Sequence, residues 1–114
     1  MNNLEKMTHK SQEAFQAAVL IAQKHGNPAV EPEHLLYEVI EPREGIVAQV
    51  LARSGVKREL VLDGLKRLVD QLPQVSGDAA KLGMSQGLLK LMNQAESTAQ
   101  SLGDTYVSVE HFLN

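Results

Sequence analysis

Residues 103–113 read GDTYVSVEHFL, and residues 26–36 read GNPAVEPEHLL. The two stretches align at a constant offset of 77 residues, which places Gly103 on Gly26 and the pair Glu110-His111 on Glu33-His34. The same offset aligns further residues upstream, which are Met84 with Met7, Ala95 with Ala18, Ala99 with Ala22 and Gln100 with Gln23. Self-similarity at a fixed offset indicates a duplicated structural unit. Each copy predicts a helix, a glycine stop, a short connection and a second helix that begins near Glu-His.

Length and composition restrict the function classes that this chain can have. With 114 residues it has the size of one domain with a modest core. The formal net charge of −3 and the scarcity of aromatic residues argue against nucleic-acid binding. The absence of cysteine excludes disulfides, a thiolate nucleophile and a cysteine-based zinc site. The polar Asn2-Asn3 start and the lack of a long apolar segment argue against export and membrane insertion.

Helical periodicity predicts an all-α fold. The first helix follows Thr8 as its N-cap and ends at Gly26, and the second begins at Pro32. We expect further helices at about 45–53, about 57–72 and 85–102, and the first turn of another after Ser108. The expected apolar or buried faces comprise Phe15, Ala18, Val19 and Ala22; Leu35, Leu36, Val39 and Ile40; Val61, Leu65, Leu68, Val69 and Leu72; and Leu88, Leu91, Met92, Ala95, Ala99 and Leu102. The helix at about 45–53 carries Ile46, Val47, Val50 and Leu51.

The whole chain, 1–114, is interpreted as one domain. Repeat one covers about 4–72, and a Pro-, Gly- and Ser-rich linker covers about 73–84. A partial second repeat covers 85–114. We expect the open second repeat to make the chain marginally stable alone or to favour association with another copy, because each exposed core leucine forfeits about 1.5–3 kcal/mol of burial.

The residues that could carry chemistry allow two readings. The Glu-His pairs suggest a metal or acid–base site, but adjacent helical residues point in different directions and no third ligand is evident. The simpler reading is that each Glu lies at a helix N-terminus and each His packs at its edge. Asp104 after the glycine stop suits turn chemistry, or else a polar cluster with Thr8 and Glu110. The chain contains no phosphate-binding GxxxxGK[ST] motif, so we expect neither catalytic residues nor nucleotide hydrolysis here.

Two of the expected helices carry more apolar residues than one buried face requires. Helix 85–102 has a second apolar edge at Leu88 and Leu89, and helix 57–72 adds Leu60 and Leu62. Such residues are either scattered on the surface or line a groove for an apolar segment. From the residues alone, the chain is therefore interpreted as a helical, soluble, non-catalytic interaction module.

The duplicated pattern resembles the Clp N-terminal repeat. The segments 4–8 (LEKMT) and 72–77 (LPQVSG) and the Ser85-Gln86-x-Leu88 helix start resemble specifically the N-terminal domains of ClpB-type AAA+ disaggregases. This resemblance covers the whole chain. It implies two pseudo-symmetric helical repeats, with the second ending early at Asn114.

The resemblance implies a cytoplasmic protein and a client-binding domain tethered to a hexameric ATP-driven ring. It implies unfolded or aggregated proteins as clients, bound at a hydrophobic surface between the repeats. No cofactor is expected in this chain; ATP and Mg²⁺ are implied for motor domains that it does not contain. The family's polar trio maps onto Thr8, Asp104 and Glu110. Because Gln94, Thr98 and His111 occupy positions that can be apolar in relatives, the client surface is expected to be more polar or shifted towards Leu88, Leu89 and Met92.

Two other functions remain open from the sequence. One is an adaptor-docking module with a polar binding face, as in Clp ATPases that work with a protease. The other is a His-carboxylate metal site around His34 or His111.

Overall fold

The computed structural model describes residues 7–75 and 82–113. In chain order the elements are α1 (His9–Lys24), β1 (Ala29–Val30), α2 (Pro32–Ile40), α3 (Ile46–Arg53), α4 (Arg58–Asp70), β2 (Gly83–Met84), α5 (Gln86–Ser101) and the 3-10 helix η2 (Val109–Leu113). The predicted all-α class is confirmed, because the strands found among these residues are only two residues long. The predicted repeat start at residue 4, the linker residues 76–81 and Asn114 lie outside the described residues.

The ends of the two long helices show the duplication directly. The Thr8 hydroxyl accepts from the Ser11 N–H at 3.3 Å, and the Ser85 hydroxyl accepts from the Leu88 N–H at 3.1 Å. Both hydroxyls satisfy an N–H that has no partner within the helix. The two helices are followed by Gly26 and Gly103 with φ of +68° and +77°. This left-handed conformation is open to glycine without a steric penalty, so the predicted caps and glycine stops are confirmed.

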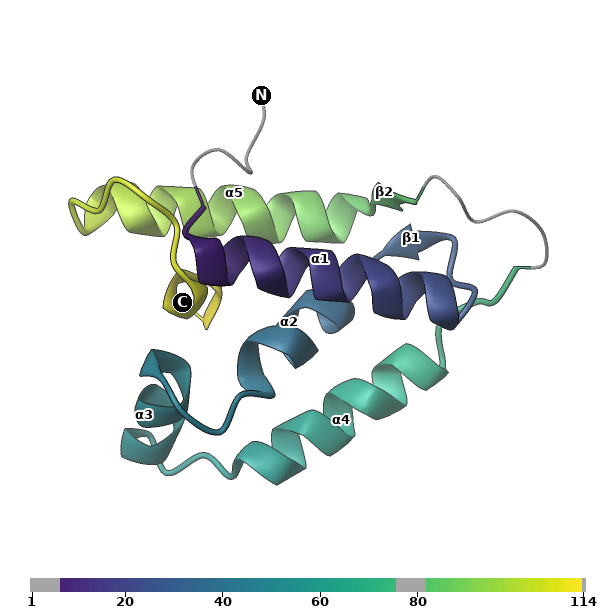
Figure 1. The fold of residues 1–114 in the computed structure, drawn as a ribbon, viewed down its shortest axis with the longest axis horizontal. Coiled ribbons are helices and arrows are strands. Elements are labelled where there is room, and N and C mark those ends of the chain that lie inside the picture. Colours follow the sequence, from purple (N-terminus) through teal and green to yellow (C-terminus); the bar gives the residue numbers. More distant parts are fainter. Residues whose placement is uncertain (1–6, 76–81, 114) are drawn as a thin grey trace.

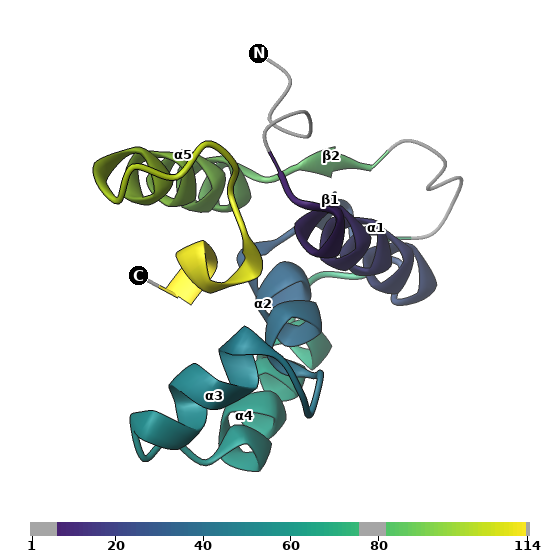
Figure 2. The same ribbon diagram turned by 60° about the vertical axis from the view of Figure 1, so that its left-hand side comes forward.

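The helices form stacked layers (Figures 1 and 2). Helices α1 and α5 lie on one side with the two strands, α2 and η2 lie beneath them, and α3 and α4 close the opposite side. Helix α2 is central because it contacts α1, α3, α4, α5 and η2. The buried face of α1 is made of small residues (Ser11, Ala14, Ala18 and Ala22), which lets α2 approach closely.

Two equivalent sets of backbone hydrogen bonds join the two repeats. Strands β1 and β2 pair in parallel, with Val30 opposite Met84, and a parallel bridge joins Met7 to Val107. The Ser85 N–H donates to the Val30 carbonyl at 3.0 Å, and the Thr8 N–H donates to the Val107 carbonyl at 3.0 Å. The residues of one pair lie 77 positions from the residues of the other. Each repeat thus holds the start of the other repeat's long helix.

Part of the expected core needs correction. Leu68 was predicted to face inward but is 47% exposed, whereas Leu62, expected at the surface edge, is buried. Helix α4 therefore packs through Leu62, Leu65 and Val69. Leu102 is also 64% exposed because it is the C-cap of α5, where the chain turns away from the core.

Candidate functional site

A buried histidine closes the connection between the first two helices. The Nδ1 atom of His34 accepts from the Glu31 N–H at 2.9 Å, and its Nε2 lies 2.9 Å from Asn27 Oδ1. The Asn27 amide also donates to the Pro73 carbonyl at 3.0 Å. Asn27 and His34 are almost wholly shielded from solvent. The pair therefore joins the start of α2 to the connection before it and to the chain after α4.

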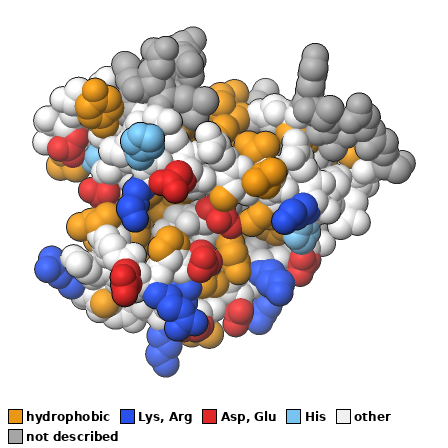
Figure 3. Space-filling model, viewed as in Figure 1, with side chains coloured by type: hydrophobic (Ala, Val, Ile, Leu, Met, Phe, Trp, Pro, Cys, Tyr) orange, Lys and Arg blue, Asp and Glu red, His pale blue; other side chains and the backbone are white. Residues whose placement is uncertain are grey.

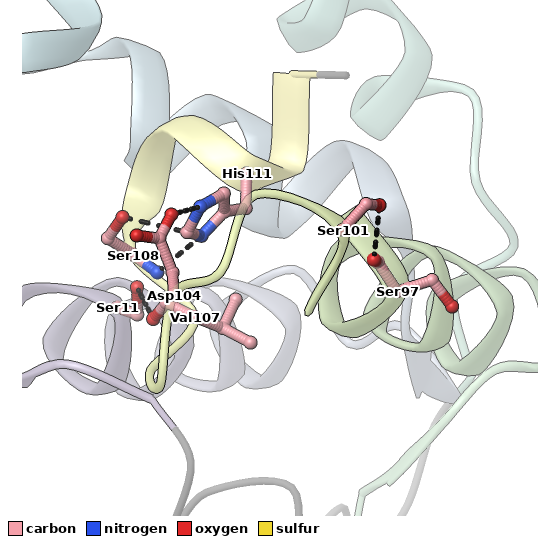
Figure 4. A network of polar contacts seen from close by, with 7 residues as sticks. All are labelled: Ser11, Ser97, Ser101, Asp104, Val107, Ser108 and His111. Carbon is pink, nitrogen blue, oxygen red and sulfur yellow. Dashed lines mark hydrogen bonds and ion pairs between the residues drawn. The ribbon is translucent and has the colours of Figure 1, made fainter. Parts of the chain in front are cut away.

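The second repeat builds the same arrangement with one chemical change. The Nδ1 atom of His111 accepts from the Ser108 N–H at 2.9 Å, and its Nε2 lies 2.9 Å from Asp104 Oδ2 (Figure 4). Asp104 thus occupies the place of Asn27. Its side chain is 51% exposed while His111 is buried, so this network carries a carboxylate at the surface.

The hydrogen bonds also fix which ring nitrogen of His34 carries the proton. Because Nδ1 of His34 accepts a backbone hydrogen bond, its proton lies on Nε2 and is donated to Asn27. Burial lowers the pKa of His34, opposed by the Glu31 carboxylate and reinforced by His25. Both nitrogens of each ring are engaged by protein groups, and the described residues contain no cluster of three metal-ligating side chains.

The predicted polar trio lies around Val107 and Ser108, in the segment that pairs with Met7 before α1. The Thr8 hydroxyl donates to Ser11 Oγ, and Ser11 in turn donates to the Val107 carbonyl at 3.0 Å. Asp104 reaches the same segment through His111 (Figure 4). Glu110 lies in η2, and its Oε1 atom is buried without a hydrogen-bond partner among the described residues. Thr8 and Asp104 are therefore linked by hydrogen bonds that meet at the peptide unit between Val107 and Ser108. Glu110 makes no hydrogen bond to this network through its buried Oε1.

The three residues of α5 that were predicted to contact clients differ in their exposure to solvent. Leu88 and Met92 are 0% and 3% exposed and belong to the core, so they are not accessible to a client in this structure. Leu89 is 41% exposed. It lies in a shallow depression on the outer face of α5 whose other lining residues are Gln86, Lys90, Asn93, Gln94, Ser97 and Thr98. This face is polar apart from Leu89.

A second opening, lined largely by apolar residues, lies where α1, α2 and α3 meet Val109 of the second repeat. We name it the seam cleft; it encloses about 490 Å³. Its lining residues are Lys10, Glu13, Ala14, Ala17, Glu38, Val39, Pro42, Glu44, Gly45, Ile46, Val47 and Val109. Figure 3 shows hydrophobic side chains interspersed with acidic and basic ones on the face where α1 lies above α2 and α3. Seven of the lining residues are apolar, and they can cover an apolar side chain of a partner.

Sequence reasoning missed the seam cleft and the role of the histidines. The cleft depends on how three helices and η2 converge, which no local pattern records. The histidines gave a signal, since each lies seven residues after Asn27 or Asp104 and three after Glu31 or Ser108. A polar residue three positions before a His resembles a capping box, in which the two residues satisfy each other's backbone N–H groups.

The family follows from comparison with known proteins. A model of the Clp repeat (R) N-terminal domain matches residues 6–114. The chain belongs to this family. Among the described residues, no helix has both the length and the apolar content needed to cross a bilayer.

Similar curated proteins are bacterial chaperones. The chain is 45% identical over 107 residues to the chaperone protein ClpB of Bdellovibrio bacteriovorus, which covers 94% of this chain and 12% of that protein. It is 35% identical over 111 residues to ClpB of Porphyromonas gingivalis, covering 97% of this chain and 13% of that protein. The chain thus spans about an eighth of these relatives.

Solved structures confirm the fold. The N-terminal domain of Hsp104 from Candida albicans superimposes with a TM-score of 0.83 at 18% identity, over 95% of this chain and 71% of that chain. A complex of a ClpV N-domain with a VipB peptide superimposes with a TM-score of 0.81 at 17% identity, over 96% and 66% of the two chains.

Proposed function

We propose that this chain is the client-binding N-terminal domain of a ClpB-type ATP-dependent disaggregase. In this function it captures apolar segments of unfolded or aggregated polypeptides and performs no covalent chemistry itself. The similarity to the named ClpB chaperones supports the parent protein, a hexameric ring with ATP-driven motors. The observation that carries the proposal is the seam cleft, an apolar hollow lined by both repeats.

The cleft suits reversible capture. Its volume of about 490 Å³ accommodates the side chains of a short segment and not a folded partner. Val39 and Val47 form a floor that is already buried, so a client adds contact without rearranging the core. Ile46 is 46% exposed at the edge of the cleft and gains burial when a client binds. Such a small contact area gives weak binding, which permits release to a motor.

The test is fluorescence anisotropy with a labelled, permanently unfolded client. We expect association at micromolar concentration, and we expect Ile46→Ser to weaken it. Leu60→Ser is the matched control, because Leu60 is 66% exposed on α4 and outside the cleft. No association of the folded chain at high micromolar concentration would refute the proposal.

A second function is favoured by the outer face of α5. Its depression is lined mainly by amide, hydroxyl and ammonium groups, which suits docking of a folded adaptor protein. The ClpV complex with a VipB peptide supports peptide docking as a use of this fold. Competition separates the two functions, because an unfolded client in the seam cleft does not displace an adaptor from α5.

A further inference from the structure

Three carboxylates are among the residues that line the seam cleft, and we call them the rim carboxylates. Glu13 comes from α1, Glu38 from α2 and Glu44 from the segment before α3. Lys10 is the only cation among the residues that line the cleft. Three carboxylates and one ammonium group therefore line this mainly apolar cleft.

None of these carboxylates forms an ion pair within the part of the chain that the structure describes. The ion pairs there engage Glu41 and Glu59 with Arg58, and Asp104 with His111, whereas none engages Glu13, Glu38 or Glu44. Arg58 also donates to the Ile40 and Glu41 carbonyls, so its guanidinium is engaged at the C-terminal end of α2. The charge at the rim is left for a partner to neutralise.

Glu38 is the least well solvated of the rim carboxylates. Burial, and then the nearby Glu41 carboxylate, raise the pKa of Glu38. A cation brought beside a partly desolvated carboxylate interacts more strongly than it does in bulk water. The side chain adjoins Val39 at the cleft floor, so a bound cation would lie next to the apolar contact.

We propose that the seam cleft selects polypeptide segments in which an apolar side chain is flanked by lysine or arginine. The apolar side chain contacts Val39, Ile46 and Val47, and the flanking cations lie against Glu13, Glu38 and Glu44. Segments flanked by aspartate or glutamate are rejected, because their charges face the same rim. This inference rests on the proposed function and specifies the client chemistry that the site prefers.

The experiment uses three labelled peptides of equal length with one apolar centre. They differ only in their flanking residues, which are lysine, serine or glutamate. Anisotropy titrations at low salt are expected to give the order lysine, serine, glutamate, with each step worth about three- to tenfold in Kd, the scale expected for partly exposed charge pairs. The lysine preference is expected to shrink in 0.5 M salt, since the Debye length is then only about 4–5 Å.

Variants of the rim carboxylates test whether the lysine preference arises at the seam cleft. Replacing Glu13, Glu38 and Glu44 together by glutamine is expected to bring the lysine and serine peptides within about twofold of each other, because the rim charges are then gone. The matched control is Asp63→Asn on α4, an exposed carboxylate outside the cleft. It is expected to keep most of the lysine preference. Circular dichroism of each variant verifies folding.

The outcomes distinguish the two proposals. Equal affinity of the lysine and serine peptides overturns the charge selection and leaves client capture standing. An equal loss of preference in Asp63→Asn also overturns it, because the effect would then come from net charge. Failure of all three peptides to bind the folded chain overturns both.

Discussion

The Nε2 atom of His111 lies 2.9 Å from Oδ2 of Asp104, in the place where His34 meets Asn27 in the first repeat. The duplication has thus kept the hydrogen bond and exchanged an amide for a carboxylate. The amide also ties down the chain after α4, whereas the carboxylate is half exposed. The two repeats share one architecture and differ in charge at the same point.

Asp104 should be important to stability as an acceptor more than as a charge. Asp104→Ala leaves the buried Nε2–H of His111 unpaired, which costs about 1–3 kcal/mol in the free energy of unfolding. Asp104→Asn retains an acceptor oxygen and is expected to cost less than half as much. Urea denaturation followed by circular dichroism measures both. Equal losses in the two variants would show that charge is the stabilising feature.

The stability of the fold should decrease as the pH is lowered, because His34 titrates differently in the folded and unfolded chain. Burial lowers the pKa of this imidazole, while the unfolded chain takes up the proton near the ordinary value of 6.5. As pH falls through 6.5, the unfolded state binds a proton that the folded state binds less well, so folding loses free energy. Unfolding at pH 7.5 and 5.5 is expected to reveal this loss, and His34→Gln is expected to reduce the difference. His9→Gln, at an exposed position, is the control. An unchanged pH dependence in His34→Gln would refute the assignment.

The two capping hydroxyls should contribute similarly. Thr8→Ala and Ser85→Ala each remove an acceptor for a helix N-terminal N–H and are expected to cost about 0.5–2 kcal/mol. Ser97→Ala, at an exposed position within α5, is expected to change stability by less than about 0.5 kcal/mol. Thermal melts of the three variants test this. A Thr8→Ala loss no larger than that of Ser97→Ala would contradict the structural role of this cap.

Leu88 and Leu89 should separate stability from binding. Leu88→Ala opens a cavity at a side chain that is 0% exposed and is expected to cost about 2–5 kcal/mol. Leu89→Ala removes a half-exposed side chain and is expected to cost less than about 1.5 kcal/mol, below the cost of a buried leucine. Chemical denaturation measures the two costs, and anisotropy with the unfolded client measures binding in Leu89→Ala. Client binding lost in Leu89→Ala while stability is kept would move the binding surface to α5.

The sequence predicted the helices well because their ends are coded locally. Thr8 and Ser85 cap their helices through hydroxyls that accept from an N–H three residues on. Pro32 and the glycines after α1 and α5 act through their own backbone. Neither effect requires tertiary information. The strands were missed because two-residue strands have no alternation to read. Their pairing also depends on segments far apart in the sequence.

The candidate site was less predictable, because exposure depends on the neighbouring helices. Leu88 and Met92 were expected at a client surface, but they share one face of α5 with its core residues. Leu62 and Leu68 exchanged their expected places for the same reason, since a slight rotation of α4 decides which leucine is covered. The seam cleft requires η2 to approach α3, a contact that spacing along the chain does not reveal.

The most direct test of client capture at the seam cleft is a two-dimensional NMR titration of the labelled chain with an unfolded polypeptide. The account predicts that the amide and methyl signals of Ala14, Ala17, Ile46 and Val109 shift first and saturate together. Shifts confined to Asn93, Gln94 and Ser97 on the outer face of α5, or no shifts in the folded chain, would contradict it.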